Sequence, residues 1–132
     1  MALTIRLLQH KAKDFNGKWY GRVVKTGEVH TKELAETISK NTTLTRADVE
    51  ATVLALVEEM KYRLQSGDTV VLDGFGRFHL TVQSDMVEHP EDFNLKKHIR
   101  RILCKFTPAA TRNQLDRHLE RNFIEGVELQ RI

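Results

Sequence analysis

The chain of 132 residues has few of the residues that mark several specialised protein classes. Its single cysteine excludes a disulfide framework and a zinc site with four thiolates from one chain. With only 2 prolines, 7 glycines and 40% hydrophobic residues, it lacks the composition of disordered and fibrous proteins. The length fits one domain, or one domain with an added element, and not two full-size domains.

The sequence also has no long apolar run. The N-terminal run 2–8 is short and contains Arg6, so it predicts neither a signal peptide nor a membrane span. The Asn41-Thr42-Thr43 sequon is interpreted as a polar helix end, and a free thiol at Cys104 agrees with a reducing compartment. We therefore expect a cytoplasmic protein without a membrane partner.

The formal net charge of +3 is small, but it is unevenly distributed. Residues 1–27 have six basic residues and one acidic residue, a local charge of +5. Residues 99–132 have seven basic and four acidic residues, a local +3, whereas residues 84–98 have four acidic and two basic residues, a local −2. Positive charge is thus concentrated at the two ends of the chain.

Hydrophobic patterning predicts two strands followed by two helices. The strands cover 3–13 and 18–25, and Asn16-Gly17 between them is a hairpin-turn signal because both positions favour positive φ. A short helix is expected over 31–41 and a longer one over 45–66, where Thr45 and Asp48 form an approximate capping box. A DNA-reading helix-turn-helix is conceivable here, but the negative exposed face favours a packed helical hairpin.

The second half predicts a bent strand, a polar loop, a second strand and a helix. The strand over 69–82 is interrupted at Gly74-Phe75-Gly76, a pattern typical of a sharp bend. A polar, acidic loop or short helix follows over 83–98, and a strand follows over 99–106. Thr107 and Pro108 are typical of the N-cap and first position of a helix, here expected to end near residue 122. The last ten residues are interpreted as a mixed tail.

The sequence offers little support for catalysis. The six histidines show no two-histidine helical metal spacing, and a weak metal site at His89 and His98 is less favoured than solvated loop histidines. Cys104 alternates with apolar residues, which indicates a buried core thiol and not a nucleophile. Gly74-Phe75-Gly76 lacks the third glycine of a nucleotide-binding loop. We therefore expect no enzymatic activity, metal, cofactor or small-molecule substrate.

Strand alternation places basic side chains on one face of the predicted sheet. The outward positions are Arg77, His79, Arg101 and Lys105, and the inward positions are Phe78, Leu80, Ile102, Cys104 and Phe106, which should pack on the two helices. Such a face suits phosphate contacts, which carry no sequence information and give salt-dependent affinity. Ordinary solvated strand residues are an equally good interpretation of this pattern taken alone.

The run 44–80 resembles the bacterial HU/IHF histone-like DNA-binding proteins without a gap. It contains Leu-Thr-Arg-Ala-Asp at 44–48, Ser-Gly-Asp at 66–68 and the Gly-Phe-Gly-x-Phe signature at 74–78. Thr31-Lys32-Glu33-Leu34 is similar to the first helix of that family, and Phe106-Thr107-Pro108 is similar to its last strand-to-helix junction. The resemblance covers roughly residues 29–120, and the whole pattern is similar to the longer HU-related proteins of the Bacteroides group.

The resemblance implies an α+β fold in an obligate, intertwined homodimer that binds double-stranded DNA. The fold would combine a helical hairpin, a small antiparallel sheet and a C-terminal helix with an extra N-terminal β element. A shared dimer core would contain Leu56, Met60, Phe75, Phe78 and Phe106. Phosphates would be held by strand residues, by exposed backbone amides at the glycine bend and by helix N-termini. The candidate residues are Gly74, Gly76, Arg77, His79, Arg101, Lys105, Thr107 and Arg112.

The sequence departs from the family pattern in three places. One is the final strand-to-helix junction, where Thr107, Ala110 and Asn113 stand in place of the family's lysines. The span 83–94, where the family has a basic arm, is acidic here, and its single Pro90 has no basic neighbours. Residues 1–28 have no counterpart in the short members, so we expect an N-terminal β extension over 1–28, a DNA-binding domain over 29–122 and a tail over 123–132. One hypothesis is a non-catalytic, nucleoid-associated DNA-binding protein of low sequence specificity. The alternative is an interaction or assembly module with weak or no DNA bending.

Overall fold

The structure is a computed structural model that describes residues 2–112 and 119–132. The chain forms two compact units. One combines Met1–His30 with Ile124–Ile132, and the other is Thr31–Phe123. The domain boundaries expected from the sequence, at residues 28 and 122, stay predictions.

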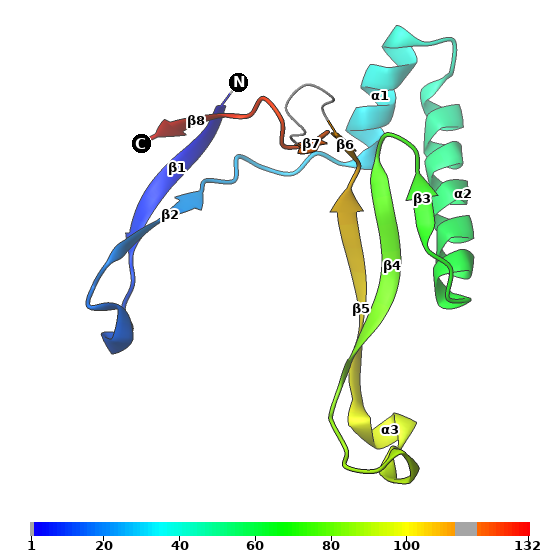
Figure 1. Ribbon diagram of the computed structural model, residues 1–132. Coiled ribbons are helices and arrows are strands. Elements are labelled where there is room, and N and C mark those ends of the chain that lie inside the picture. Colours follow the sequence, from blue (N-terminus) through cyan, green and yellow to red (C-terminus); the bar gives the residue numbers. More distant parts are fainter. Residues whose placement is uncertain (1, 113–118) are drawn as a thin grey trace. The chain divides into compact units, whose positions relative to one another are not determined.

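The first unit begins with an antiparallel hairpin of β1 (Ala2–Gln9) and β2 (Trp19–Val23) (Figure 1). Asn16 and Gly17 have φ of 47° and 67°, as the turn signal predicts. The connection is longer than a two-residue turn, however, because a 3₁₀ turn at Lys13–Phe15 precedes them. Sequence patterning therefore locates the chain reversal but not the length of its loop.

The end of the chain adds a third strand to this sheet. β8 (Glu128–Arg131) pairs in parallel with β1, and the strand order is β2-β1-β8. The Ile132 amide donates to the Ile5 carbonyl at 3.1 Å, and Gln130 Nε2 donates to Thr4 Oγ1 at 2.8 Å. Residues that the sequence presents as a mixed tail thus form a strand at one edge of the N-terminal sheet.

The second unit begins with two helices, α1 (Thr31–Asn41) and α2 (Arg46–Gln65). The predicted capping box is present: the Thr45 side chain accepts from the Asp48 amide, and the Asp48 side chain accepts from the Thr45 amide. The other end of α2 closes with a Schellman pattern, in which Gly67 (φ 96°) and Asp68 donate to the carbonyls of Leu64 and Arg63. Both ends of α2 are therefore fixed by local sequence.

Burial in this unit is concentrated where the two helices meet. Ala35 of α1 is 0% exposed and Val49 of α2 is 6% exposed. They are the only buried hydrophobic residues in the described chain. The two helices pack against each other, as expected from the negative charge of their exposed face, which favours a packed hairpin over a DNA-reading helix-turn-helix.

A three-stranded antiparallel sheet of order β3-β4-β5 follows α2. Its strands are β3 (Val70–Leu72), β4 (Gly76–Ser84) and β5 (Ile99–Pro108). β4 and β5 form a long ribbon that ends in a 3₁₀ turn at Pro90–Asp92 and the single-turn helix α3 (Leu95–His98) (Figure 1). The predicted bend at the glycines is a complete reversal, because β3 and β4 are antiparallel neighbours.

The prediction of a C-terminal helix after Phe106 is wrong for the residues that the structure describes. Thr107 and Pro108 continue β5, opposite Arg77 and Gly76 of β4. The next elements are β6 (Ala110–Arg112) and β7 (Leu119–Arg121), which pair antiparallel, while residues 113–118 of the predicted helix lie outside the described residues. Pro108 is tolerated at the strand end because a terminal position needs no donor from it. The Thr-Pro signal for a helix start is thus overridden by pairing with β4.

The chain buries little apolar surface by itself. Large hydrophobic side chains remain exposed in both units, among them Trp19, Leu54 and Ile102. The described elements therefore carry more apolar surface than one copy of the chain covers.

Candidate nucleic-acid interface

One face of the β4–β5 ribbon carries basic side chains, as strand alternation predicts. His79 lies opposite Lys105, and Arg77 lies opposite Thr107, so these four residues share a face. Farther along the same face Arg101 lies opposite Gln83, and its Nε donates to Gln83 Oε1 at 2.7 Å. Arg77, Arg101 and Lys105 are exposed, and none of them has an acidic partner within the described residues. We call Arg77, His79, Arg101 and Lys105 the basic face.

The glycine bend lies at one end of the basic face and borders a cavity of about 330 Å³. Gly74, Gly76, Arg77 and Thr107 all line this cavity, together with Val71, Leu72, Asp73 and residues 108–110. Gly74 has a φ of 77°, a left-handed conformation that favours glycine. The structure thus brings four of the eight predicted DNA-binding residues together around one opening.

The bend is held from both sides by backbone and side-chain hydrogen bonds. The Phe75 amide donates to the Leu72 carbonyl at 2.9 Å, and the Ala109 amide donates to the Phe75 carbonyl at 3.0 Å. Asn122 Nδ2 donates to the Gly74 carbonyl at 2.6 Å. Sequence reasoning missed Asn122, because nothing local connects it with a loop 48 residues earlier.

An aromatic cluster packs beside the bend. The ring centroids of Phe78 and Phe106 lie 4.7 Å apart, and Phe75 lies 5.5 Å from Phe106. Phe123 joins the cluster at 5.4 Å from Phe75, edge to face. The three phenylalanines expected in a shared core are therefore neighbours, and the fourth was hidden in the predicted tail.

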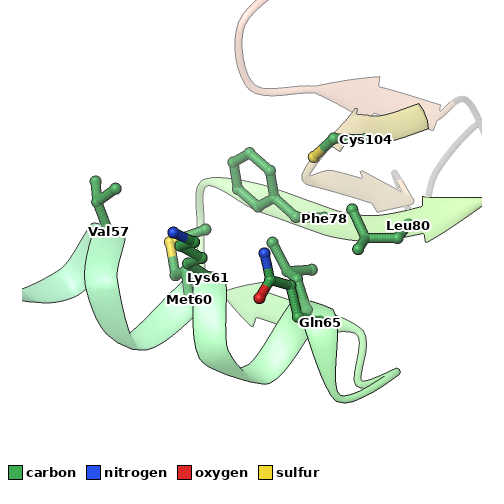
Figure 2. A pocket seen from close by; sticks show the side chains of 8 residues that line it. Val57, Met60, Lys61, Gln65, Phe78, Leu80 and Cys104 are labelled. Atoms are coloured by element: carbon green, nitrogen blue, oxygen red, sulfur yellow. The ribbon is translucent and has the colours of Figure 1, made fainter. Parts of the chain in front are cut away.

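The opposite face of the ribbon forms an open apolar groove with α2. The groove has a volume of about 310 Å³ and is lined by Val57, Met60, Lys61, Leu64, Gln65, Phe78, Leu80 and Cys104. Figure 2 shows the labelled side chains of α2 and of the strands on the two sides of this groove. Ile102, which was expected to pack inward, is 67% exposed. Cys104 is exposed as well, which corrects the predicted buried thiol, because the groove that it lines is open to solvent.

The tip of the ribbon is a structured loop. The Asn94 side chain accepts from the amides of Lys96 and Lys97 and so caps α3, while the Asn94 amide donates to His98 Nδ1 at 2.8 Å. At the base of the loop Arg100 Nε donates to a carboxylate oxygen of Asp85. His98 is thus a structural residue, a role that its sequence context did not indicate.

Three further predictions concern a DNA contact at Arg112, metal binding and membrane spans. Arg112 lies in β6 opposite Leu119, and its role as a DNA contact stays a prediction. Within residues 2–112 and 119–132, no group of three or more His, Cys, Asp or Glu side chains is placed to hold a metal ion. No helix in the same residues is long and apolar enough to cross a membrane.

Comparisons with known proteins agree with these features. Residues 1–121 match a family model described as HU-HIG, an HU domain fused to wHTH, Ig or glycine-rich motifs. The integration host factor alpha subunits of Aliivibrio fischeri (strain MJ11) and Aliivibrio salmonicida (strain LFI1238) are each 42% identical over 53 residues. These 53 residues are 40% of this chain and 54% of each subunit, so the chain spans about half the length of the curated relatives it matches.

A solved structure shares the fold over nearly the whole chain. It is a candidate DNA-binding protein from Bacteroides vulgatus ATCC 8482, with a TM-score of 0.63 and 10% sequence identity. The match covers 98% of this chain and 48% of that protein. The resemblance to HU/IHF proteins is confirmed, because the chain belongs to the HU-HIG family of HU-domain proteins.

Proposed function

We propose that this chain is a non-catalytic, nucleoid-associated protein that binds double-stranded DNA through phosphates, with low sequence specificity. The basic face of β4 and β5 is the observation that carries this proposal, because its cations are exposed and lack acidic partners in the described residues. Exposed Arg and Lys side chains on a rigid strand pair match the phosphate contacts that position a protein on a duplex. Such contacts release counterions, so affinity falls steeply with salt.

The glycine bend adds backbone donors to this surface. Gly74 and Gly76 line the cavity together with Arg77, and without side chains they leave the backbone accessible to an approaching phosphate. Membership of an HU-domain family and the fold shared with a candidate DNA-binding protein support the same conclusion.

The binding form in this proposal is a homodimer. One chain leaves the groove between α2 and the ribbon open, and buries only Ala35 and Val49 among the hydrophobic residues described. A second copy that fills the groove would complete a core around Met60, Phe78 and the neighbouring phenylalanines. Covering apolar surface stabilises by about 25 cal/mol per Å², which makes association favourable at this face.

A titration of duplex DNA across ionic strength tests the proposal. The variant R101E/K105E should bind at least tenfold more weakly at low salt, and equally so for unrelated duplex sequences, because phosphate contacts carry no sequence information. The charge-matched control K32E/K40E alters exposed residues of α1 and should retain wild-type affinity. Absence of duplex affinity in the wild type at low salt, or equal losses in both variants, would contradict the proposal.

A second candidate is an assembly module with weak or no DNA bending. It is favoured by the charge of the ribbon tip, where Asp85, Glu88, Glu91 and Asp92 outnumber Lys96 and Lys97. An acidic tip is repelled by phosphate, so it disfavours insertion into a groove of the duplex. Duplex affinity without bending would keep the first proposal and limit it to binding along the basic face.

A further inference from the structure

The N-terminal sheet has two chemically different faces. Register and alternation place Leu3, Ile5, Leu7, Trp19, Val23, Leu129 and Arg131 on one face. The other face carries Arg6 and Leu8 of β1 opposite Arg22 and Tyr20 of β2. His10 and Lys18 extend it beyond the strands, joined by a hydrogen bond of 2.8 Å from the His10 amide to the Lys18 carbonyl. One face is thus mainly apolar, and the other combines cations with aromatic rings.

Arg6 and Arg22 are direct cross-strand partners with the same charge. Like charges directly opposite each other destabilise a strand pair, and here neither guanidinium has an acidic partner in the described residues. The only carboxylate that the register places on this face is Glu128 opposite Ala2, about 13 Å from Arg6 along β1. Folding therefore retains an unfavourable pair that an anionic ligand would neutralise.

Aromatic groups and a cavity lie next to this pair. Tyr20 is 43% exposed, and its ring lies 5.9 Å from that of His10, which packs 4.2 Å from Phe15. A cavity of about 350 Å³ is lined by Leu8, Gln9, His10, Lys11 and Tyr20. His10 Nδ1 accepts from the Ala12 amide at 3.2 Å, which helps to fix the imidazole. The exposed Tyr20 ring thus lies beside a cavity, and the next residue pair on the same face of the sheet is Arg6 and Arg22.

We propose that this face of the N-terminal sheet binds single-stranded nucleic acid. Arg6 and Arg22 contact the phosphates, and Tyr20 provides a stacking surface for a base at the cavity. Only a strand without a partner presents the faces of its bases to an aromatic side chain, and cations beside aromatic rings are the usual composition of such platforms. This site is separate from the basic face of β4 and β5, and the inference does not depend on duplex binding there.

Fluorescence anisotropy with the intact chain tests the inference. The probes are labelled dT12, labelled rU12 and a 20-base-pair duplex, so DNA and RNA strands are compared directly. The variant R6A/R22A should bind the single strand that the wild type prefers at least tenfold more weakly, and Y20A about fivefold more weakly. Both should retain wild-type duplex affinity, whereas R101E/K105E should retain single-strand affinity.

Two further measurements separate binding from structure. R131A removes one cation from the opposite face of the same sheet and should leave single-strand affinity unchanged. Thermal unfolding without nucleic acid should show a higher Tm for R22T than for the wild type, because the like-charge pair is removed. Unchanged single-strand affinity in R6A/R22A, an equal loss in R131A, or parallel losses for single strand and duplex would overturn the inference.

Discussion

Asn122 Nδ2 donates a hydrogen bond of 2.6 Å to the carbonyl of Gly74, across 48 residues of sequence. The same residue donates its amide to the Ala109 carbonyl at 3.0 Å, and the Ala109 amide donates to Phe75. Asn122 therefore connects the β6–β7 strand pair with the glycine bend that borders the basic face. The segment that ends at Asn122, expected as a helix, instead supports the candidate site through these hydrogen bonds.

Replacing Asn122 tests this support. N122A should lower the free energy of unfolding by about 1 kcal/mol, because the Gly74 carbonyl loses a side-chain donor. The aspartate side chain in N122D has nearly the shape of asparagine but no amide donor, so the free energy of unfolding should fall at least as much as in N122A. Urea unfolding of the three proteins measures the difference, and an N122D variant as stable as the wild type would contradict the role of this bond.

The two glycines of the bend should respond differently to alanine. At Gly76 an added Cβ would lie 2.5 Å from the Thr107 carbonyl oxygen and against the Phe106 ring. The free energy of unfolding of G76A should therefore fall by at least about 3 kcal/mol, or the variant should fail to fold. At Gly74 the added Cβ meets no atom within 4 Å, and the cost is the left-handed φ of 77°, about 1–2 kcal/mol. Thermal unfolding of both variants tests the order; equal losses would contradict it.

The proposed dimer predicts a difference between two faces of α2. Met60 lines the apolar groove, whereas Tyr62 is 66% exposed on another side of the helix. M60K should abolish dimers or prevent folding, because it places a charge in the shared core, while Y62K should remain dimeric. Sedimentation equilibrium measures the association; a stably folded wild-type monomer at tens of micromolar would refute the dimer.

Cys104 provides a chemical reporter of the same groove. It is exposed in the single chain and lines the groove beside Leu80. If a second copy covers the groove, the thiol should react with a disulfide reagent at least tenfold more slowly in the native protein than in urea. Equal rates in both conditions would show that the groove stays open in solution.

The acidic ribbon tip predicts little DNA bending. Fluorescence energy transfer between the ends of a bound duplex should change only slightly for the wild type. E88K/E91K reverses two of the tip charges and should strengthen duplex binding, because phosphate then attracts the tip. A large change of end-to-end distance with the wild type would show that the tip bends DNA despite its charge.

Local signals were sufficient for much of the fold. Thr45 and Asp48 fixed the start of α2, and Gly67 fixed its end, because caps depend on residues close in sequence. Strand alternation placed Arg77, His79, Arg101 and Lys105 on one face, because side chains two residues apart in a strand point to the same side of the sheet. These features required no knowledge of the rest of the molecule.

Partners distant in the sequence decided what local signals could not. Thr107 and Pro108 have the residue types of a helix start, yet pairing with Arg77 and Gly76 keeps them in β5. β8 is too short to indicate a strand alone and forms through parallel pairing with β1. Arg6 and Arg22 become a like-charge pair only through the register of β1 and β2. The sequence by itself determined the caps, the alternation that gives the basic face, and the local charges. Tertiary pairing decided the C-terminal strands and the Arg6–Arg22 pair of the N-terminal sheet, because register is set by contacts between distant segments.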